Sequence, residues 1–140
     1  MPVTKEQLIA ELNKDLEWEY AAAVQYVQHA AVLTGAQYDG IRKELVIHSQ
    51  EELQHANVLA EQIDFLGGVP TIDVENRDVS NESEEMLRQD LAGEENAITR
   101  YKERIRQAEE LQEYGLRRVL EDILIQEEEH KRDLLDALGH

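Results

Sequence analysis

One fixed separation between similar residues recurs along this chain and constrains its fold more than any other feature. The pattern Glu-x-x-His occurs at Glu52 and His55, and it returns at Glu127 and His130. We call the separation of Glu52 and Glu127 the repeat distance. On a helix, residues three apart lie within about 60° of each other around the axis, so each Glu and His would point the same way. The sequence therefore predicts two similar copies of a helical unit.

Long runs of helix-forming residues account for most of the chain, and the only prolines are Pro2 and Pro70. We predict helices over about 5–33, 40–66, 82–113 and 115–138. The expected N-caps of the first three are Thr4, Asp39 and Asn81. A break at Tyr114-Gly115 is expected to separate the last two helices.

The connections between these helices are expected to run short, long, short. Short links make neighbouring helices antiparallel. Residues 69–81 show no clean period, and a loop of this length crosses a bundle because extended chain covers about 3.3 Å per residue. We therefore predict an all-α fold in a single domain, residues 1–140, with two antiparallel helical hairpins joined by a long crossover.

Glu52 and Glu127 each lie within the apolar stripe of a predicted helix. The residues that share the face of Glu52 are Ile41, Leu45, Leu59, Ile63 and Leu66. Those that share the face of Glu127 are Leu116, Leu120, Leu134 and Leu138. An isolated buried carboxylate is very costly, so each must meet a partner, a proton or a metal.

The first helix of each predicted hairpin repeats a Glu and a Tyr. Glu19 and Glu94 are separated by the repeat distance, as are Tyr26 and Tyr101. An approximate two-fold axis would gather six residues inside the bundle: Glu19, Glu52, His55, Glu94, Glu127 and His130. Two divalent cations would offset the four carboxylates, and this donor set suits Fe or Mn, with Zn also acceptable. A buried network of salt bridges and hydrogen bonds is the alternative.

Within such a site, Glu19 and Glu94 would be terminal ligands, while Glu52 and Glu127 would bridge the ions. The two tyrosines would orient carboxylates from outside the ligand set. Other side chains are assigned to the surface or to structural roles. These are Asp15 and Asp90 at solvated helix ends, His29 and His48 as structural or surface histidines, and Glu51 as a solvated residue.

Composition narrows the functional class. Lys plus Arg number 14 and Asp plus Glu 31, so the net charge of −17 disfavours nucleic acid and favours cations. The absence of Cys excludes disulfides, thiolate catalysis and cysteine metal sites. No apolar run approaches about 18 residues, and no secretory leader is recognised, so we expect a cytoplasmic protein without a membrane span.

The motifs together resemble the ferritin-like di-iron carboxylate proteins, and among them most closely the bacterioferritins. The segments that carry the resemblance are 19–26, 51–56, 65–70, 85–94 and 127–130. The resemblance implies a ferritin-like four-helix bundle with a di-iron ferroxidase centre. In such a centre Fe(II) is oxidised by O2 or H2O2, and ferric mineral collects in a homo-oligomeric shell for iron storage and detoxification.

Two departures from the bacterioferritin pattern change these expectations. Leu53 replaces the Met that serves as haem ligand in that family, so no haem is expected. The chain ends at Gly139-His140 without a fifth helix, which leaves the homo-oligomer open between a dimer and a larger shell. A rubrerythrin-like peroxidase or a Mn-catalase-like enzyme that stores no iron remains the alternative function, and a structural or idle site is the third.

Overall fold

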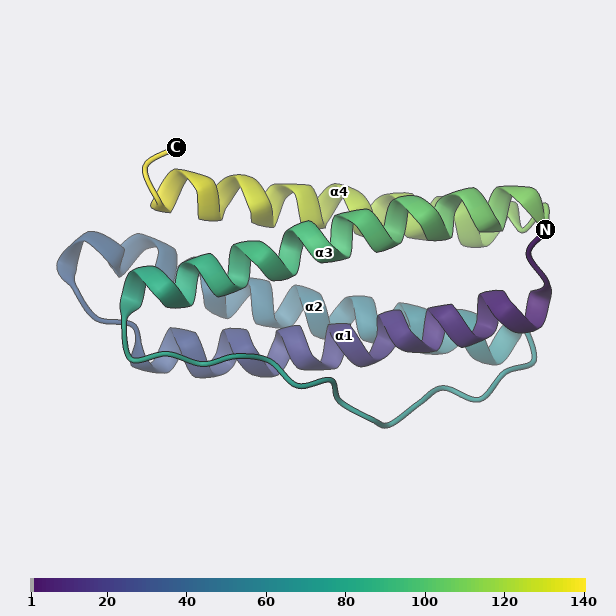
Figure 1. Cartoon of the computed structure of the whole chain (residues 1–140), viewed down its shortest axis with the longest axis horizontal. Coiled ribbons are helices and arrows are strands. Elements are labelled where there is room, and N and C mark those ends of the chain that lie inside the picture. The colour runs from purple at the N-terminus through teal and green to yellow at the C-terminus, as the bar shows by residue number, and fades with distance from the viewer. Residues whose placement is uncertain (1) are drawn as a thin grey trace.

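The computed structural model describes residues 2–140, which form four α-helices, one short 3-10 helix and no strand. The helices are α1 (Lys5–Val32), η1 (Ala36–Tyr38), α2 (Asp39–Phe65), α3 (Ser83–Glu110) and α4 (Tyr114–Ala137). Figure 1 shows them side by side along one long axis, which confirms the predicted all-α bundle. None of the helices in this part of the chain is long and apolar enough to cross a membrane.

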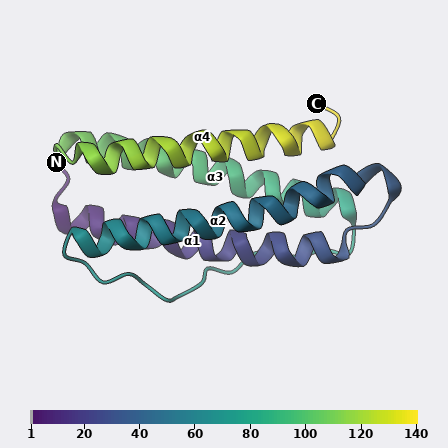
Figure 2. The same ribbon diagram turned by 180° about the vertical axis from the view of Figure 1, so that it is seen from behind.

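The bundle consists of two antiparallel hairpins, α1 with α2 and α3 with α4, as Figures 1 and 2 show from opposite sides. Residues 66–82 return along the outer side of α1 to reach the start of α3. Asn13 donates a hydrogen bond to the carbonyl of Val69 at 3.0 Å, and Gln25 donates one to the carbonyl of Asp78 at 2.7 Å. Side chains of α1 thus hold the crossover near both of its ends.

The start of α1 follows the predicted capping box, whereas α2 begins differently. The Gln7 backbone N–H donates to Thr4 Oγ1 at 3.1 Å, and the Thr4 N–H donates to Gln7 Oε1 at 2.9 Å. The prediction of Asp39 as N-cap was wrong, because η1 leads directly into α2 and places Tyr38 at the cap. Asp39 instead occupies the first turn, where a carboxylate interacts favourably with the helix dipole.

The boundaries of α3 and α4 also differ from the prediction. Glu82, rather than Asn81, precedes the first residue of α3. The break between the two helices lies at residues 111–113, and Gly115 lies inside α4. Gln112 takes the left-handed conformation, with φ of 59°, that usually marks a glycine at a helix end. Because Gln112, and not a glycine, makes this turn, the break predicted from Gly115 was placed a few residues too late in the chain.

Apolar side chains fill the two ends of the bundle and leave a polar layer between them. One cluster includes Leu12, Leu59, Ile63, Leu116 and Leu120, and the other includes Ile41, Leu45, Leu87 and Leu134. Each fully buried Leu or Ile contributes roughly 1.5–3 kcal/mol through the hydrophobic effect. These clusters hold the helices in fixed positions around the charged groups at mid-length.

Candidate metal centre

The six predicted ligand residues all lie in the polar layer, and each is at most 3% exposed. They come from all four helices: Glu19 from α1, Glu52 and His55 from α2, Glu94 from α3, and Glu127 and His130 from α4. They form two overlapping groups whose ligand atoms lie within 4.8 Å of one another. Glu52 and Glu127 belong to both groups, which is the arrangement expected of bridging carboxylates.

His55 is the imidazole of the first group. Its Nδ1 lies 3.2 Å from Glu52 Oε1, 3.5 Å from Glu19 Oε2 and 3.7 Å from Glu127 Oε1. One nitrogen therefore faces carboxylate oxygens from three different helices. A cation between these atoms would receive one nitrogen and several oxygen donors.

His130 occupies the matching place in the second group. Its Nδ1 lies 2.9 Å from Glu94 Oε2, 3.2 Å from Glu127 Oε1 and 3.4 Å from Glu52 Oε1. The repeat of the sequence thus becomes an approximate two-fold symmetry, with one imidazole on each side of the two shared carboxylates.

Each of the two predicted tyrosines donates a hydrogen bond to a glutamate of the other hairpin. Tyr101 OH donates to Glu19 Oε1 at 2.5 Å, and Tyr26 OH donates to Glu94 Oε2 at 2.8 Å. Each tyrosine hydroxyl bonds only one of the two oxygens of its glutamate, and it makes no bond to the second oxygen. The tyrosines therefore fix the orientation of the two glutamates that belong to only one group each.

The residues that contact the outer nitrogens of the imidazoles were not predicted from the sequence. His55 Nε2 lies 2.5 Å from Gln126 Oε1, and His130 Nε2 lies 3.0 Å from Glu51 Oε1. Glu51 was predicted to be solvated, and its side chain is still 31% exposed, but it also reaches across to α4 and accepts a bond from Gln126 Nε2 at 3.0 Å. The signal was present, since Glu51 and Gln126 are themselves separated by the repeat distance.

Several buried ligand atoms of this layer have no hydrogen-bond partner among residues 2–140. They are Glu19 Oε2, Glu52 Oε1, both carboxylate oxygens of Glu127 and His55 Nδ1. Buried polar atoms are normally satisfied, and an unsatisfied one costs about 1–3 kcal/mol. The unsatisfied atoms belong to the two shared carboxylates, to Glu19 and to one imidazole, so the donor set fits a pair of cations.

A sequence model of the ferritin-like domain matches residues 9–140. The chain belongs to the ferritin-like family. A bacterioferritin from Brucella melitensis is 31% identical over 95% of this chain and 87% of its own length. The resemblance inferred from the motifs is thereby confirmed.

Two solved structures are similar to this ferritin-like chain over nearly its whole length. A ferritin-like di-iron carboxylate protein from Bacillus anthracis has a TM-score of 0.93 at 32% identity, covering 99% of this chain and 100% of that one. The bacterioferritin-related protein of Bacteroides fragilis, described as a dodecameric thioferritin, has a TM-score of 0.90 at 32% identity. That match covers 97% of this chain and 86% of the other.

Burial and mutual contact shift the pKa values of the ferritin-like centre strongly. Burial, together with repulsion from Glu52, raises the pKa of Glu94 to about 8. Burial alone would lower the pKa of His55, but the nearby carboxylates of Glu19 and Glu52 raise it to about 11. Burial and neighbouring carboxylates also raise the pKa of Glu127 well above its ordinary value. Without metal, bound protons therefore offset part of the buried negative charge.

Asp15 and Asp90 are buried, so their placement at solvated helix ends was wrong. Arg104 Nε donates to Asp15 Oδ2 at 2.7 Å, and His29 Nδ1 lies 2.8 Å from Asp90 Oδ1. His29 and Arg104 are also separated by the repeat distance, so the two pairs are related by the repeat. They join α1 to α3 beside the ferritin-like centre and are not among its ligands.

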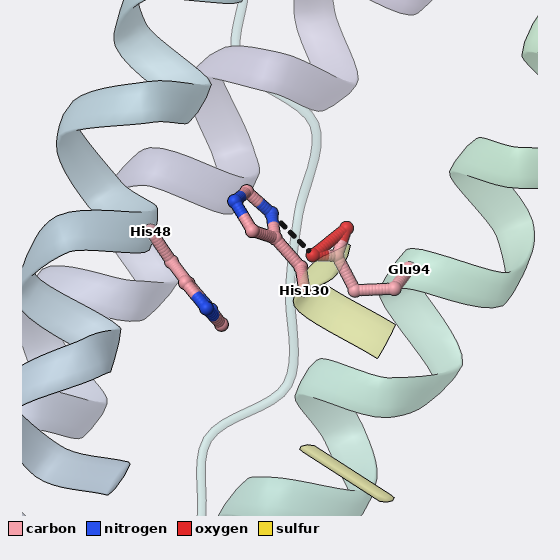
Figure 3. Close-up of side chains that lie close together, drawn as sticks. All are labelled: His48, Glu94 and His130. Carbon is pink, nitrogen blue, oxygen red and sulfur yellow. Dashed lines mark hydrogen bonds and ion pairs between the residues drawn. The ribbon is translucent and has the colours of Figure 1, made fainter. Parts of the chain in front are cut away.

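His48 is buried, and Figure 3 shows it beside His130 and Glu94 of the centre. Its ring stacks on that of His130 with centroids 4.0 Å apart, and its Nε2 lies 3.1 Å from Asp133 Oδ2. Burial, together with repulsion from His130, lowers the pKa of His48 to about 4. Leu53, in contrast, lies on the outside of α2 with 52% of its surface exposed, away from the centre.

Proposed function

We propose that this ferritin-like chain is a ferroxidase of the bacterioferritin type, which binds two Fe(II) ions and oxidises them with O2 or H2O2. The observation that carries the proposal is the set of unsatisfied carboxylate oxygens enclosed between two imidazoles in the middle of the bundle. The proposed ligands are Glu19, Glu52, His55, Glu94, Glu127 and His130.

The roles of these residues follow from their neighbours. Glu19 and Glu94 each face one imidazole and are held by a tyrosine, so each is proposed to bind a single ion. Glu52 and Glu127 face both imidazoles and are proposed to bridge the two ions. Four carboxylates offset the charge of two divalent cations, and the oxygen-rich set also suits Fe(III), Mn(II) or Zn(II).

The bound substrate supplies the redox chemistry. Two Fe(II) ions lose one electron each, which converts one H2O2 to two hydroxide ions or, with two protons, one O2 to H2O2. The chain contributes the enclosure: the six residues are almost fully buried, so only a small oxidant reaches the ions. Because His55 and Glu94 carry raised pKa values, they release protons as the ions bind.

We further propose that the chain assembles into a hollow homo-oligomer in which the ferric product collects. The dodecameric state of the related Bacteroides protein and the similarity to bacterioferritin support this proposal. Size in solution distinguishes it from a peroxide-consuming enzyme that stores nothing. A shell of many subunits that retains ferric iron supports storage, whereas a dimer that turns over H2O2 without retaining iron contradicts it.

The proposed centre is tested with Glu52→Ala and Glu127→Ala. Fe(II) is added without oxygen, O2 or H2O2 is then mixed in, and the rise of ferric absorbance is followed by stopped flow. We expect each variant to slow this rise by at least about 100-fold, because removal of a ligand should exceed the effect of removing a ligand's hydrogen-bond partner. Glu129→Ala, an exposed carboxylate on α4, is the matched control and should oxidise Fe(II) like the wild type. An unchanged rate in Glu52→Ala would place the oxidation elsewhere.

A further inference from the structure

A third group of ligand-type side chains lies beside the di-metal centre. Glu44 and His48 are one helical turn apart on α2, and Asp133 is on α4. One ligand atom from each of the three lies within 4.8 Å of the others. This group shares no residue with the six proposed ligands of the centre.

His48 is an unusual residue for a purely structural role. It is only 1% exposed, yet its Nδ1 has no hydrogen-bond partner in the described chain, residues 2–140. Its ring stacks on that of His130 and meets the ring of Tyr26 almost at a right angle, with the Tyr26 centroid 5.1 Å away. His48 Nε2 contacts Asp133, but burial of Nδ1 without a partner is costly and is not expected of a purely structural histidine.

The group connects the protein surface with the centre. Glu44, Asp133 and Asp136 line an open pocket near the first turns of α2 and the last turns of α4. Asp133 is partly exposed, whereas His48, whose Nε2 lies 3.1 Å from Asp133 Oδ2, is buried and does not line the pocket. A ring nitrogen of His48 also lies within 4.8 Å of ligand atoms of Glu94 and His130. Figure 3 shows these three side chains, with His130 between His48 and Glu94.

The internal repeat provides a comparison within the same molecule. The positions that the repeat relates to Glu44, His48 and Asp133 are occupied by Val119, Ile123 and Val58. Those three aliphatic side chains belong to, or pack against, the apolar core at the other end of the bundle. The bundle therefore accepts apolar residues at this place, and the polar group at one end is not required by the architecture.

We propose that Glu44, His48 and Asp133 form an additional binding site for a divalent transition-metal ion, one per chain, between solvent and the di-metal centre. Two carboxylates offset the charge of such an ion, and the imidazole favours Fe(II), Co(II) or Zn(II) over Mg(II) or Ca(II). An ion held here would lie between the acidic pocket, which Glu44 and Asp133 line, and the centre, where the ring of His130 stacks on that of His48.

The test uses the full-length protein, freed of metal and titrated with Co(II) under anaerobic conditions. Bound Co(II) is counted by equilibrium dialysis with metal analysis and followed through its visible absorption. We expect three ions per wild-type chain.

The variant Glu44→Val/His48→Ile/Asp133→Val copies the residues of the other end and should bind two. Asp133→Asn changes one exposed carboxylate without risk to folding and should weaken the third ion at least tenfold. Asp136→Asn, in the same pocket but outside the group, should bind three like the wild type.

The outcomes separate this inference from the proposed function. Two Co(II) ions in the wild type would overturn the additional site and leave the di-metal centre intact. Three ions in both the wild type and the triple variant would place the third ion elsewhere and also overturn it. A wild-type chain that binds no Co(II) would overturn both proposals.

Discussion

The two imidazoles of the centre meet different partners at their outer nitrogens. His130 Nε2 faces a carboxylate oxygen of Glu51, whereas His55 Nε2 faces an amide oxygen of Gln126. A carboxylate behind a ligand histidine makes that histidine a stronger donor than an amide does, and it also adds negative charge near the ion. The two halves of the centre are therefore similar in geometry and unequal in electrostatics.

This difference predicts two unequal metal affinities, with the tighter ion on the His130 side. Glu51→Gln should weaken the tighter ion by about 10-fold and bring the two affinities together. Calorimetric titration with Co(II) measures both. Gln126→Glu is the reciprocal variant and should strengthen the ion beside His55. A gap between the two affinities that survives in Glu51→Gln would show that the difference has another origin.

The raised pKa values predict how stability depends on pH. The pKa of His55 is raised to about 11 and that of Glu94 to about 8, so both groups stabilise the metal-free fold in full below their ordinary pKa values. That contribution is lost as pH rises through the folded values. The melting temperature of metal-free protein should therefore fall between about pH 6 and about pH 9.

Bound metal should reverse this trend, because the ions replace the protons that would otherwise be lost. The difference in melting temperature between Zn(II)-loaded and metal-free protein should thus grow as pH rises. Glu52 and His48, whose pKa values are lowered, lose their contribution only on the acidic side of this window. Thermal unfolding followed by circular dichroism provides the measurement, and a metal-free melting temperature that rises over the window would contradict the assignment.

At the scale of the helices, the residues with positive φ among residues 2–140 lie at helix ends or in the turns beside them. Gln112 makes the turn between α3 and α4 with a φ of 59°, although it has a side chain. The Glu113 N–H donates to the Ala108 carbonyl at 2.8 Å, which closes the end of α3. Gly67 makes the corresponding turn after α2, with a φ of 95° that suits glycine. The same kind of helix end is therefore built once with glycine and once without it.

Gln112→Gly should stabilise the protein by about 0.5–1 kcal/mol, because the strain removed exceeds the added freedom of the unfolded chain. Gly67→Ala tests the opposite direction and should destabilise by about 1 kcal/mol, since no neighbour obstructs the new methyl group and only the backbone is strained. Urea unfolding of both variants measures these changes. A loss of stability in Gln112→Gly would mean that its side chain makes a contact worth more than the strain.

At the scale of the whole molecule, the first hairpin presents an apolar outer face. Val24 and Val27 of α1 and Val46 and Leu53 of α2 are each between 46% and 62% exposed. Val46 and Leu53 are two helical turns apart on one side of α2. We expect an apolar surface of this kind, on a chain with a net charge of −17, to be a contact between subunits of the proposed homo-oligomer.

Leu53→Glu should disrupt the proposed assembly, because a buried carboxylate would meet its own copy or an apolar surface across the contact. Light scattering after size exclusion should show a smaller particle than the wild type. Ile125→Glu, at an equally exposed position on α4, is the control and should keep the wild-type size. An unchanged particle in Leu53→Glu would place the subunit contact on another face.

The sequence alone was sufficient to predict the bundle and its six central residues. Helical periodicity determines which side chains of one helix face the core, and Glu52 and Glu127 stood among Leu and Ile on those faces. The repeat distance then related the helices to one another before any packing was known. The prediction of bound cations then followed from charge, because the negative charge of four buried carboxylates must be neutralised whatever the detailed geometry.

Only the tertiary structure decided which residues surround that centre. Glu51 reaches His130, Asp15 meets Arg104, and His48 stands beside Asp133 because of how far each helix is rotated and shifted along its neighbours. The periodicity of a single helix carries no information on that rotation or offset, since the packing of all four helices sets both. The sequence thus determined which residues face inward, and the structure decided which of them meet.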